Sequence, residues 1–77
     1  MNIEETVISV IADALNVDDT LITKDLSIGD IPEWDSVGNL AIISSIEAKM
    51  DIEIPLEDLF DLTSVALLID EVEKLKA

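Results

Sequence analysis

The chain of 77 residues contains neither cysteine nor histidine. Without cysteine there is no disulfide, no thiolate metal ligand and no thiol nucleophile. Without histidine the usual general base at neutral pH is missing. No serine of this chain can therefore belong to a Ser-His-Asp or Cys-His constellation. We expect a protein that is not an enzyme, and chemistry on any of its hydroxyl groups has to be performed by another protein.

Aromatic side chains are also scarce, because Trp34 and Phe60 are the only two and tyrosine is absent. The hydrophobic fraction is nevertheless 49%, which predicts a folded chain with an aliphatic core. No apolar run approaches the roughly 20 residues of a membrane-spanning helix, and no basic segment precedes an apolar one at the N-terminus. We therefore expect a single domain over residues 1–77, without membrane insertion, in the cytoplasm.

Positively charged residues are also scarce. Four lysines stand against 18 acidic residues, and the formal net charge is −14. Binding to nucleic acid or to an anionic membrane surface needs clustered cations, so both are disfavoured. Long-range attraction instead favours protein partners with basic patches. We expect a monomer that meets such partners.

The apolar residues that are present recur at helical spacing. They predict a first helix capped by Asn2 and ending near Asn16, and a second helix over residues 36–50. One stripe of this second helix is expected to face inward; it comprises Val37, Leu40, Ile43, Ile46 and Met50. The opposite, outer face is expected to carry Asn39, Ser44, Ser45, Glu47 and Ala48.

Between and after these helices the chain is less regular. Residues 16–35 are rich in turn formers, yet their scattered apolar residues predict an ordered loop packed over the helices. Pro55 follows a short connector and precedes a short helix over residues 56–61. Thr63 or Ser64 then caps a last helix that runs to about Lys76. The fold class is therefore all-α, a small four-helix bundle of three long helices and one short one.

Ser36 stands where the long loop becomes the second helix. The unpaired N–H groups and the dipole of a helix N-terminus favour negative charge, so a phosphate on Ser36 would lie in a favourable field. The alternative is that Asp35 or Ser36 only caps the helix, since both residue types are preferred there.

The order of elements, together with Trp34-Asp35-Ser36-Val37, Ile52-Glu53-Ile54-Pro55 and Thr63-Ser64-Val65, resembles acyl carrier proteins and the related peptidyl carrier domains over the full length. The resemblance implies that a phosphopantetheinyl transferase attaches 4′-phosphopantetheine from coenzyme A to Ser36, and that the arm holds an acyl or aminoacyl group as a thioester. Asp35 would help to orient the transferase's Mg²⁺ and coenzyme A, or would only cap the helix. Val37 would contact partners and the base of the arm.

The same resemblance implies a partner-binding surface. The surface would comprise Trp34, Asp35, Val37, Glu47 and Leu56. The facing apolar stripes of the helices would also let a linear acyl chain enter a pocket between them, whereas a polar cargo would stay on the surface near Ser36. The pocket would lie between facing helices, lined by Leu40, Ile43, Ile46, Leu59, Phe60, Val65, Leu68 and Ile69. The short helix is the expected gate, because short elements open most readily.

The second helix departs from carriers of fatty acid synthesis, which carry acids along it for basic residues of their enzymes. The matching positions here hold Gly38, Ala41 and Ala48. The departure, with the Trp-Asp-Ser form, favours a specialised pathway such as polyketide, non-ribosomal peptide or polysaccharide-modifying biosynthesis. A second hypothesis is an acidic helical adaptor or inhibitor that binds a basic protein without any cofactor.

Overall fold

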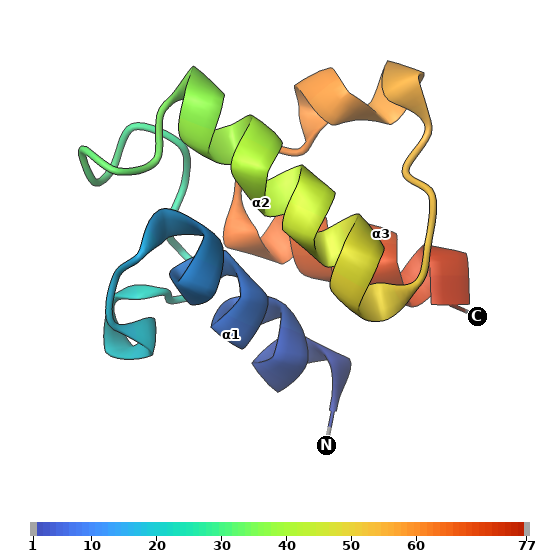
Figure 1. Cartoon of the computed structure of the whole chain (residues 1–77), viewed down its shortest axis with the longest axis horizontal. Coiled ribbons are helices and arrows are strands. Elements are labelled where there is room, and N and C mark those ends of the chain that lie inside the picture. Colours follow the sequence, from blue (N-terminus) through green and yellow to red (C-terminus); the bar gives the residue numbers. More distant parts are fainter. Residues whose placement is uncertain (1, 77) are drawn as a thin grey trace.

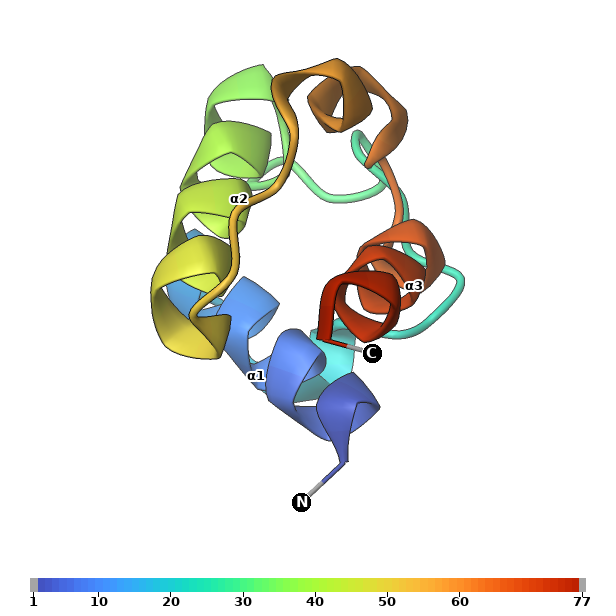
Figure 2. The same cartoon turned by 90° about the vertical axis from the view of Figure 1, so that its right-hand side faces the viewer.

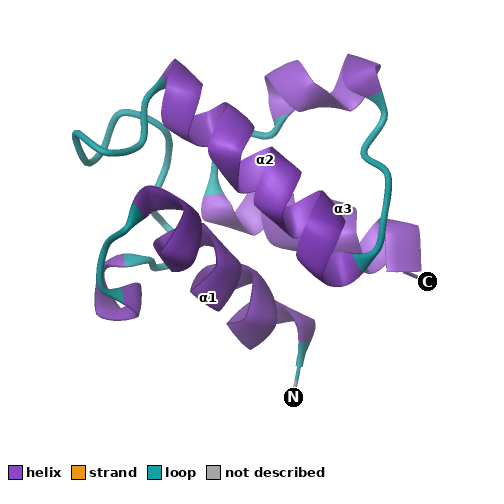
Figure 3. Cartoon of the chain, viewed as in Figure 1, coloured by secondary structure: helices purple, strands orange, loops and turns teal. Residues whose placement is uncertain are grey.

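The computed structural model describes residues 2–76, which form an all-helical domain (Figures 1 and 3). Its α-helices are α1 (Ile3–Leu15), α2 (Ser36–Met50) and α3 (Val65–Lys76). The 3₁₀ helices are η1 (Asp19–Leu21) and η2 (Leu56–Asp61). The predicted fold class, three long helices and a short one, is confirmed. The one-turn helix η1 inside the first connection was not predicted.

The three α-helices enclose the core, with α1 packed against α2 and, less extensively, against α3. Figure 2 shows α1 at the bottom, α2 and α3 on the two sides, and η2 at the top. The core is aliphatic apart from Trp34, as predicted. Its largest fully buried side chains are Trp34, Ile11, Ile42, Ile46, Leu68, Val7, Val65 and Val72.

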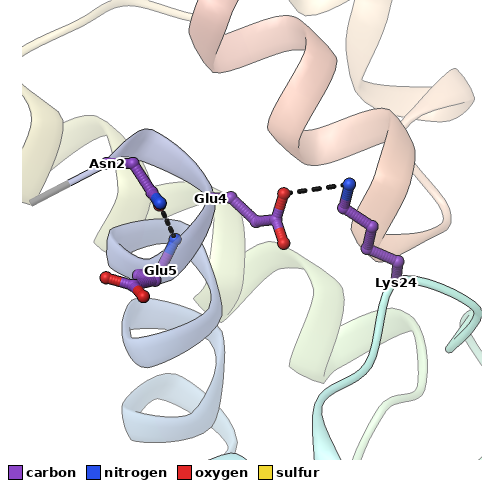
Figure 4. A network of polar contacts seen from close by, with 4 residues as sticks. All are labelled: Asn2, Glu4, Glu5 and Lys24. Atoms are coloured by element: carbon purple, nitrogen blue, oxygen red, sulfur yellow. Dashed lines mark hydrogen bonds and ion pairs between the residues drawn. The ribbon is translucent and has the colours of Figure 1, made fainter.

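Local chemistry fixes where α1 begins and ends. The side chain of Asn2 accepts a hydrogen bond from the Glu5 N–H at 2.8 Å, which caps the first turn (Figure 4). Asn16 ends the helix in the left-handed region at φ 58°, and its N–H bonds back to the carbonyl oxygens of Ala12 and Asp13. Both residues act as predicted, because asparagine accepts hydrogen bonds locally and tolerates positive φ.

The first connection, residues 16–35, packs over the helices as predicted. Asp18 caps η1, and the hydrogen bond from the Thr20 N–H lowers the pKa of its carboxyl. Lys24 forms an exposed ion pair with Glu4 of α1 at 2.9 Å (Figure 4), which raises the pKa of Lys24 but adds little stability in water. An isolated backbone bridge between Ser27 and Ser64 ties the loop to the start of α3.

The second connection, residues 51–64, is held mainly at its ends. Ile54 and Leu62 are buried, whereas no residue of η2 between them is. The Ile54 N–H donates to a carboxylate oxygen of Glu47 at 2.9 Å. The ammonium of Lys76 donates to the Met50 carbonyl oxygen at 2.9 Å, where the dipole of α2 favours a cation.

The inward face of α2 differs from the predicted stripe in its first half. Ile43, Ile46 and Met50 are buried as predicted, but the exposed fractions of Val37 and Leu40 are 74% and 59%. Asn39, predicted on the outer face, is buried. The periodicity failed here because the first connection packs against the first turn of α2 beside α1, as shown by the hydrogen bond between Trp34 and Asn39 and by the closeness of Glu33 and Leu15 to Gly38.

None of the helices formed by residues 2–76 has the length and apolarity that crossing a membrane requires.

Candidate functional site

Ser36 is the first residue of α2, and its side chain is exposed. The cap is Asp35, whose carboxylate accepts a hydrogen bond from the Gly38 N–H at 2.8 Å. The Ser36 hydroxyl forms no hydrogen bond within residues 2–76. Of the two residues weighed as caps, Asp35 performs that role, which leaves the hydroxyl of Ser36 free for chemistry.

A buried pair braces this turn from within. The indole N–H of Trp34 donates to the side-chain oxygen of Asn39 at 3.0 Å, and the Trp34 side chain is fully buried. The two residues stand on either side of Ser36, so their bond fixes the loop to the first turn of α2. Trp34 was predicted as a partner-binding residue, and this is wrong for its side chain, because the loop folds the indole into the core.

Gly38 is required by the close approach of the loop. A Cβ atom at this position would lie 2.4 Å from the Glu33 carbonyl oxygen and 3.0 Å from a Leu15 methyl group. The residue therefore has a packing role that its sequence position did not reveal. Its lack of an acidic side chain therefore has a structural cause, whereas Ala41 and Ala48 lie on the exposed part of α2.

The loop is also closed on itself next to Ser36. The Gly29 N–H donates to the Trp34 carbonyl oxygen at 2.8 Å, with Gly29 at φ 90°, a conformation that glycine adopts without strain. The carboxylate of Asp30 accepts from the Ser27 N–H at 2.8 Å. Ser36 is thus presented by a turn whose backbone is fixed on both sides.

The surroundings of Ser36 fit an attached phosphodiester. The N–H groups of Ser36 and Val37 have no acceptor among the described residues, and the dipole of a 15-residue helix favours negative charge at this end. The carboxylate of Asp35 is already engaged with Gly38. A phosphate esterified to Ser36 would lie beside these two N–H groups.

An apolar groove of about 390 Å³ opens beside Ser36 between α2 and η2, near the lower end of the roughly 300–1,000 Å³ typical of small-molecule sites. It is lined by Ile28, Ser36, Asn39, Leu40, Ile43, Leu56, Leu59, Phe60 and Thr63. Of the eight residues predicted for an acyl pocket, Leu40, Ile43, Leu59 and Phe60 lie here. The other four, Ile46, Val65, Leu68 and Ile69, lie in the core and not in the groove.

The remaining predicted partner residues differ in how far their side chains are exposed to solvent. Val37 and Leu56 are both 74% exposed, and Leu56 also lines the groove. Glu47 is half-buried, since one of its oxygens is engaged with the Ile54 N–H. Their role in binding partners stays a prediction.

Two features of this region were missed by sequence reasoning. Asn39 lies three residues after Ser36, so helical spacing could have placed both at one groove. Glu71 of α3, which follows Asp70 and precedes Val72, is buried near Asp58 of η2. Burial raises the pKa of the Glu71 carboxyl, and the Asp58 carboxyl raises it further. No pattern in the sequence pairs these two residues.

Comparison with known proteins identifies the arrangement. Residues 5–72 match the family described as "Phosphopantetheine attachment site". The chain is 33% identical over 75 residues to an acyl carrier protein of Akkermansia muciniphila, covering 97% of this chain and 94% of that protein. The solution structure of a holo acyl carrier protein from Geobacter metallireducens superimposes with a TM-score of 0.85 at 28% identity, covering 99% of this chain and 87% of that one.

Proposed function

The chain belongs to the phosphopantetheine-attachment family, in which acyl carrier proteins hold their cofactor covalently, and we propose that Ser36 is its attachment residue. The observation that carries the proposal is the exposed, unbonded hydroxyl at the start of α2, beside the apolar groove. The family assignment favours a carrier over the adaptor considered from composition alone.

In this reaction the chain presents the Ser36 hydroxyl and stabilises the negative charge of the attached phosphate. The Ser36 oxygen would form a bond to the phosphorus that carries the pantetheine of coenzyme A. The bond from that phosphorus to the bridging oxygen of the pyrophosphate would break, adenosine 3′,5′-bisphosphate would leave, and the transferase would take the hydroxyl proton. The N–H groups of Ser36 and Val37, which lack acceptors within residues 2–76, would be available to the resulting phosphodiester. When attached, the arm supplies a terminal thiol for thioester formation, which this cysteine-free chain otherwise lacks.

The proposal includes partners and pathway. Supported by the net charge of −14, the partners are a phosphopantetheinyl transferase and acyl-loading or acyl-transfer enzymes with basic patches, acting in the cytoplasm on a monomeric carrier. Asp35, Val37, Glu47 and Leu56 form the proposed contact surface. Ala41 and Ala48, in place of acids on exposed positions of α2, support a specialised pathway over housekeeping fatty acid synthesis.

The test is modification in vitro with an active transferase and coenzyme A, followed by mass spectrometry. The wild-type chain should gain one phosphopantetheine, and Ser36→Ala none. The fold should survive, because Ser36 makes no side-chain hydrogen bond and such surface changes usually cost less than about 0.5 kcal/mol. The matched control is Ser44→Ala, an exposed serine of the same helix, which should be modified fully. A modified Ser36→Ala chain would show that the attachment residue lies elsewhere.

A further inference from the structure

Asn39 combines two properties that its place in the fold explains. It lies three residues after Ser36 on α2, about 4.5 Å further along the helix axis, and both residues line the groove. It is also one of the few buried polar residues, with an exposed fraction of 9%. An amide in this position is close to anything that enters the groove from Ser36.

The orientation of that amide is fixed by Trp34. An indole N–H can only donate, so the Asn39 oxygen has to face the indole, as the 3.0 Å distance shows. The amide nitrogen, Nδ2, must then point the other way. Nδ2 has no acceptor among residues 2–76. It is not sealed inside the protein, so solvent or a ligand can reach it. The groove is the opening that Asn39 lines.

Nδ2 is therefore a donor without a partner among residues 2–76, in a groove whose other polar lining residues are Ser36 and Thr63. Its neighbours along the groove include Leu40, Ile43 and Leu59. A plain alkyl chain beside it would displace water from the N–H groups and return no hydrogen bond, whereas an oxygen at this depth would restore one. Sites with a positioned donor discriminate against analogues that lack the acceptor.

We propose that Asn39 is a specificity-determining residue for the cargo: its Nδ2 donates a hydrogen bond to an oxygen at carbon 3 of the acyl group. The groove then favours 3-oxo or 3-hydroxy acyl groups over unsubstituted alkyl groups. This inference rests on the proposed function, because the cargo reaches the groove on an arm attached at Ser36.

The sharpest test uses the wild-type protein and NMR. The chain contains no glutamine and three asparagines, so its spectrum holds three side-chain amide pairs, from Asn2, Asn16 and Asn39. The holo protein is loaded with octanoyl or 3-oxooctanoyl groups, and loading is verified by mass before each spectrum. We expect the Asn39 amide protons to shift downfield with the 3-oxooctanoyl group only, while Asn2 and Asn16 stay unchanged.

A 3-oxoacyl thioester has two carbonyl oxygens, at carbon 1 and carbon 3. The octanoyl form has only the first, so comparing the two cargoes shows which oxygen Nδ2 binds. Equal shifts with both cargoes would show that Nδ2 binds the thioester carbonyl or the arm, and would overturn the proposal. No shift with either would overturn it as well. Failure of the proposed function is recognised separately, since no holo protein would form at all.

A matched pair of variants adds a second readout, the exchange of backbone amides in residues 56–63. Asn39→Asp keeps an acceptor for the Trp34 indole and removes the donor, whereas Thr63→Val removes another polar group from the same groove. In wild type, 3-oxooctanoyl should slow this exchange about tenfold more than octanoyl, as expected for one hydrogen bond. Asn39→Asp should abolish the difference and Thr63→Val should keep it. The opposite pattern would assign the discrimination to Thr63. If Asn39→Asp does not fold, the wild-type spectra still decide.

Discussion

The two aromatic side chains lie one in each long connection and have opposite surroundings. Trp34, at the end of residues 16–35, is fully buried and hydrogen-bonded to Asn39. Phe60, in η2 of residues 51–64, is 84% exposed. Both connections join the same kind of element, so the contrast reflects their tasks: the first fixes Ser36 in place, and the second covers one side of a groove.

The bonding of the two connections follows the same division. The first connection is tied to its surroundings by satisfied polar contacts, such as those of Trp34, Gly29 and Asp35. The second is anchored at Ile54 and Leu62, while η2 between them buries no residue. Elements with few buried contacts open at low free-energy cost. An immobile attachment point beside a movable wall is what a tethered cargo requires.

The largest effect is expected from truncating Trp34, and truncating Phe60 is the matched control. Trp34→Ala should destabilise the fold by about 3–5 kcal/mol, because it leaves a cavity and removes the partner of Asn39. That loss is comparable to the whole stability of a small domain, so much of the chain should be unfolded. Phe60→Ala should stay within about 0.5 kcal/mol of wild type. Urea unfolding followed by circular dichroism measures both. Similar losses for the two variants would remove the contrast between the connections.

Gly38 provides a second, smaller test of the first connection. Helix propensity alone predicts that Gly38→Ala stabilises α2 by up to about 1 kcal/mol. The short distance from a Cβ to the Glu33 carbonyl oxygen predicts the opposite sign, a net loss of about 1–2 kcal/mol as the loop is pushed away.

The control for this substitution is Ala41→Gly, one turn further on and exposed. It should lose up to about 1 kcal/mol through propensity alone. If Gly38→Ala instead proves more stable than wild type in urea, the loop does not press on α2 at this point.

Gly38 and Asn39 also show which features could be predicted from the sequence and which could not. Caps and turn formers fixed the helix boundaries correctly, because Asn2, Asn16 and Asp35 act on backbone groups within a few residues. The inner face of the first turns of α2 could not be predicted, since it depends on a non-helical loop folding Trp34 against Asn39. Periodicity describes a helix that packs against helices, and here it assigned Asn39 outward and Leu40 inward.

The candidate site divides in the same way. The position of Ser36 at the start of a helix was predicted correctly, whereas its choice as attachment residue came from the family resemblance and stays a prediction. Half of the predicted pocket residues line the groove. Ile46, Val65, Leu68 and Ile69 were misplaced, because a linear pattern gives the apolar face of a helix but not the depth at which the core closes. The pair of Glu71 and Asp58 depends on how η2 settles on α3, which no local signal encodes.

That pair gives the last prediction, which concerns how tightly the second connection closes. Glu71 is 8% exposed, and one of its carboxylate oxygens has no hydrogen-bond partner among the described residues. Burial raises its pKa, the Asp58 carboxyl of η2 raises it further, and Lys74 of the same helix partly opposes the shift. The folded state therefore binds this proton more tightly than the unfolded chain does. Its contribution to stability is complete below the ordinary pKa of glutamate, and is lost as pH rises through the raised folded-state value.

Glu71→Gln should remove this pH dependence. The amide resembles the protonated carboxyl, so the variant should match wild type at acidic pH, and at pH above the raised pKa it should be more stable by about 1 kcal/mol, the net value of one satisfied hydrogen bond. The control is Glu73→Gln, two residues away and exposed, which removes the same charge without the buried oxygen. Urea midpoints of the three proteins across a pH series separate the two effects. If Glu73→Gln is stabilised as much as Glu71→Gln, with the same pH profile, the added stability comes from the reduced net charge. Burial of Glu71 beside Asp58 would then not be the cause.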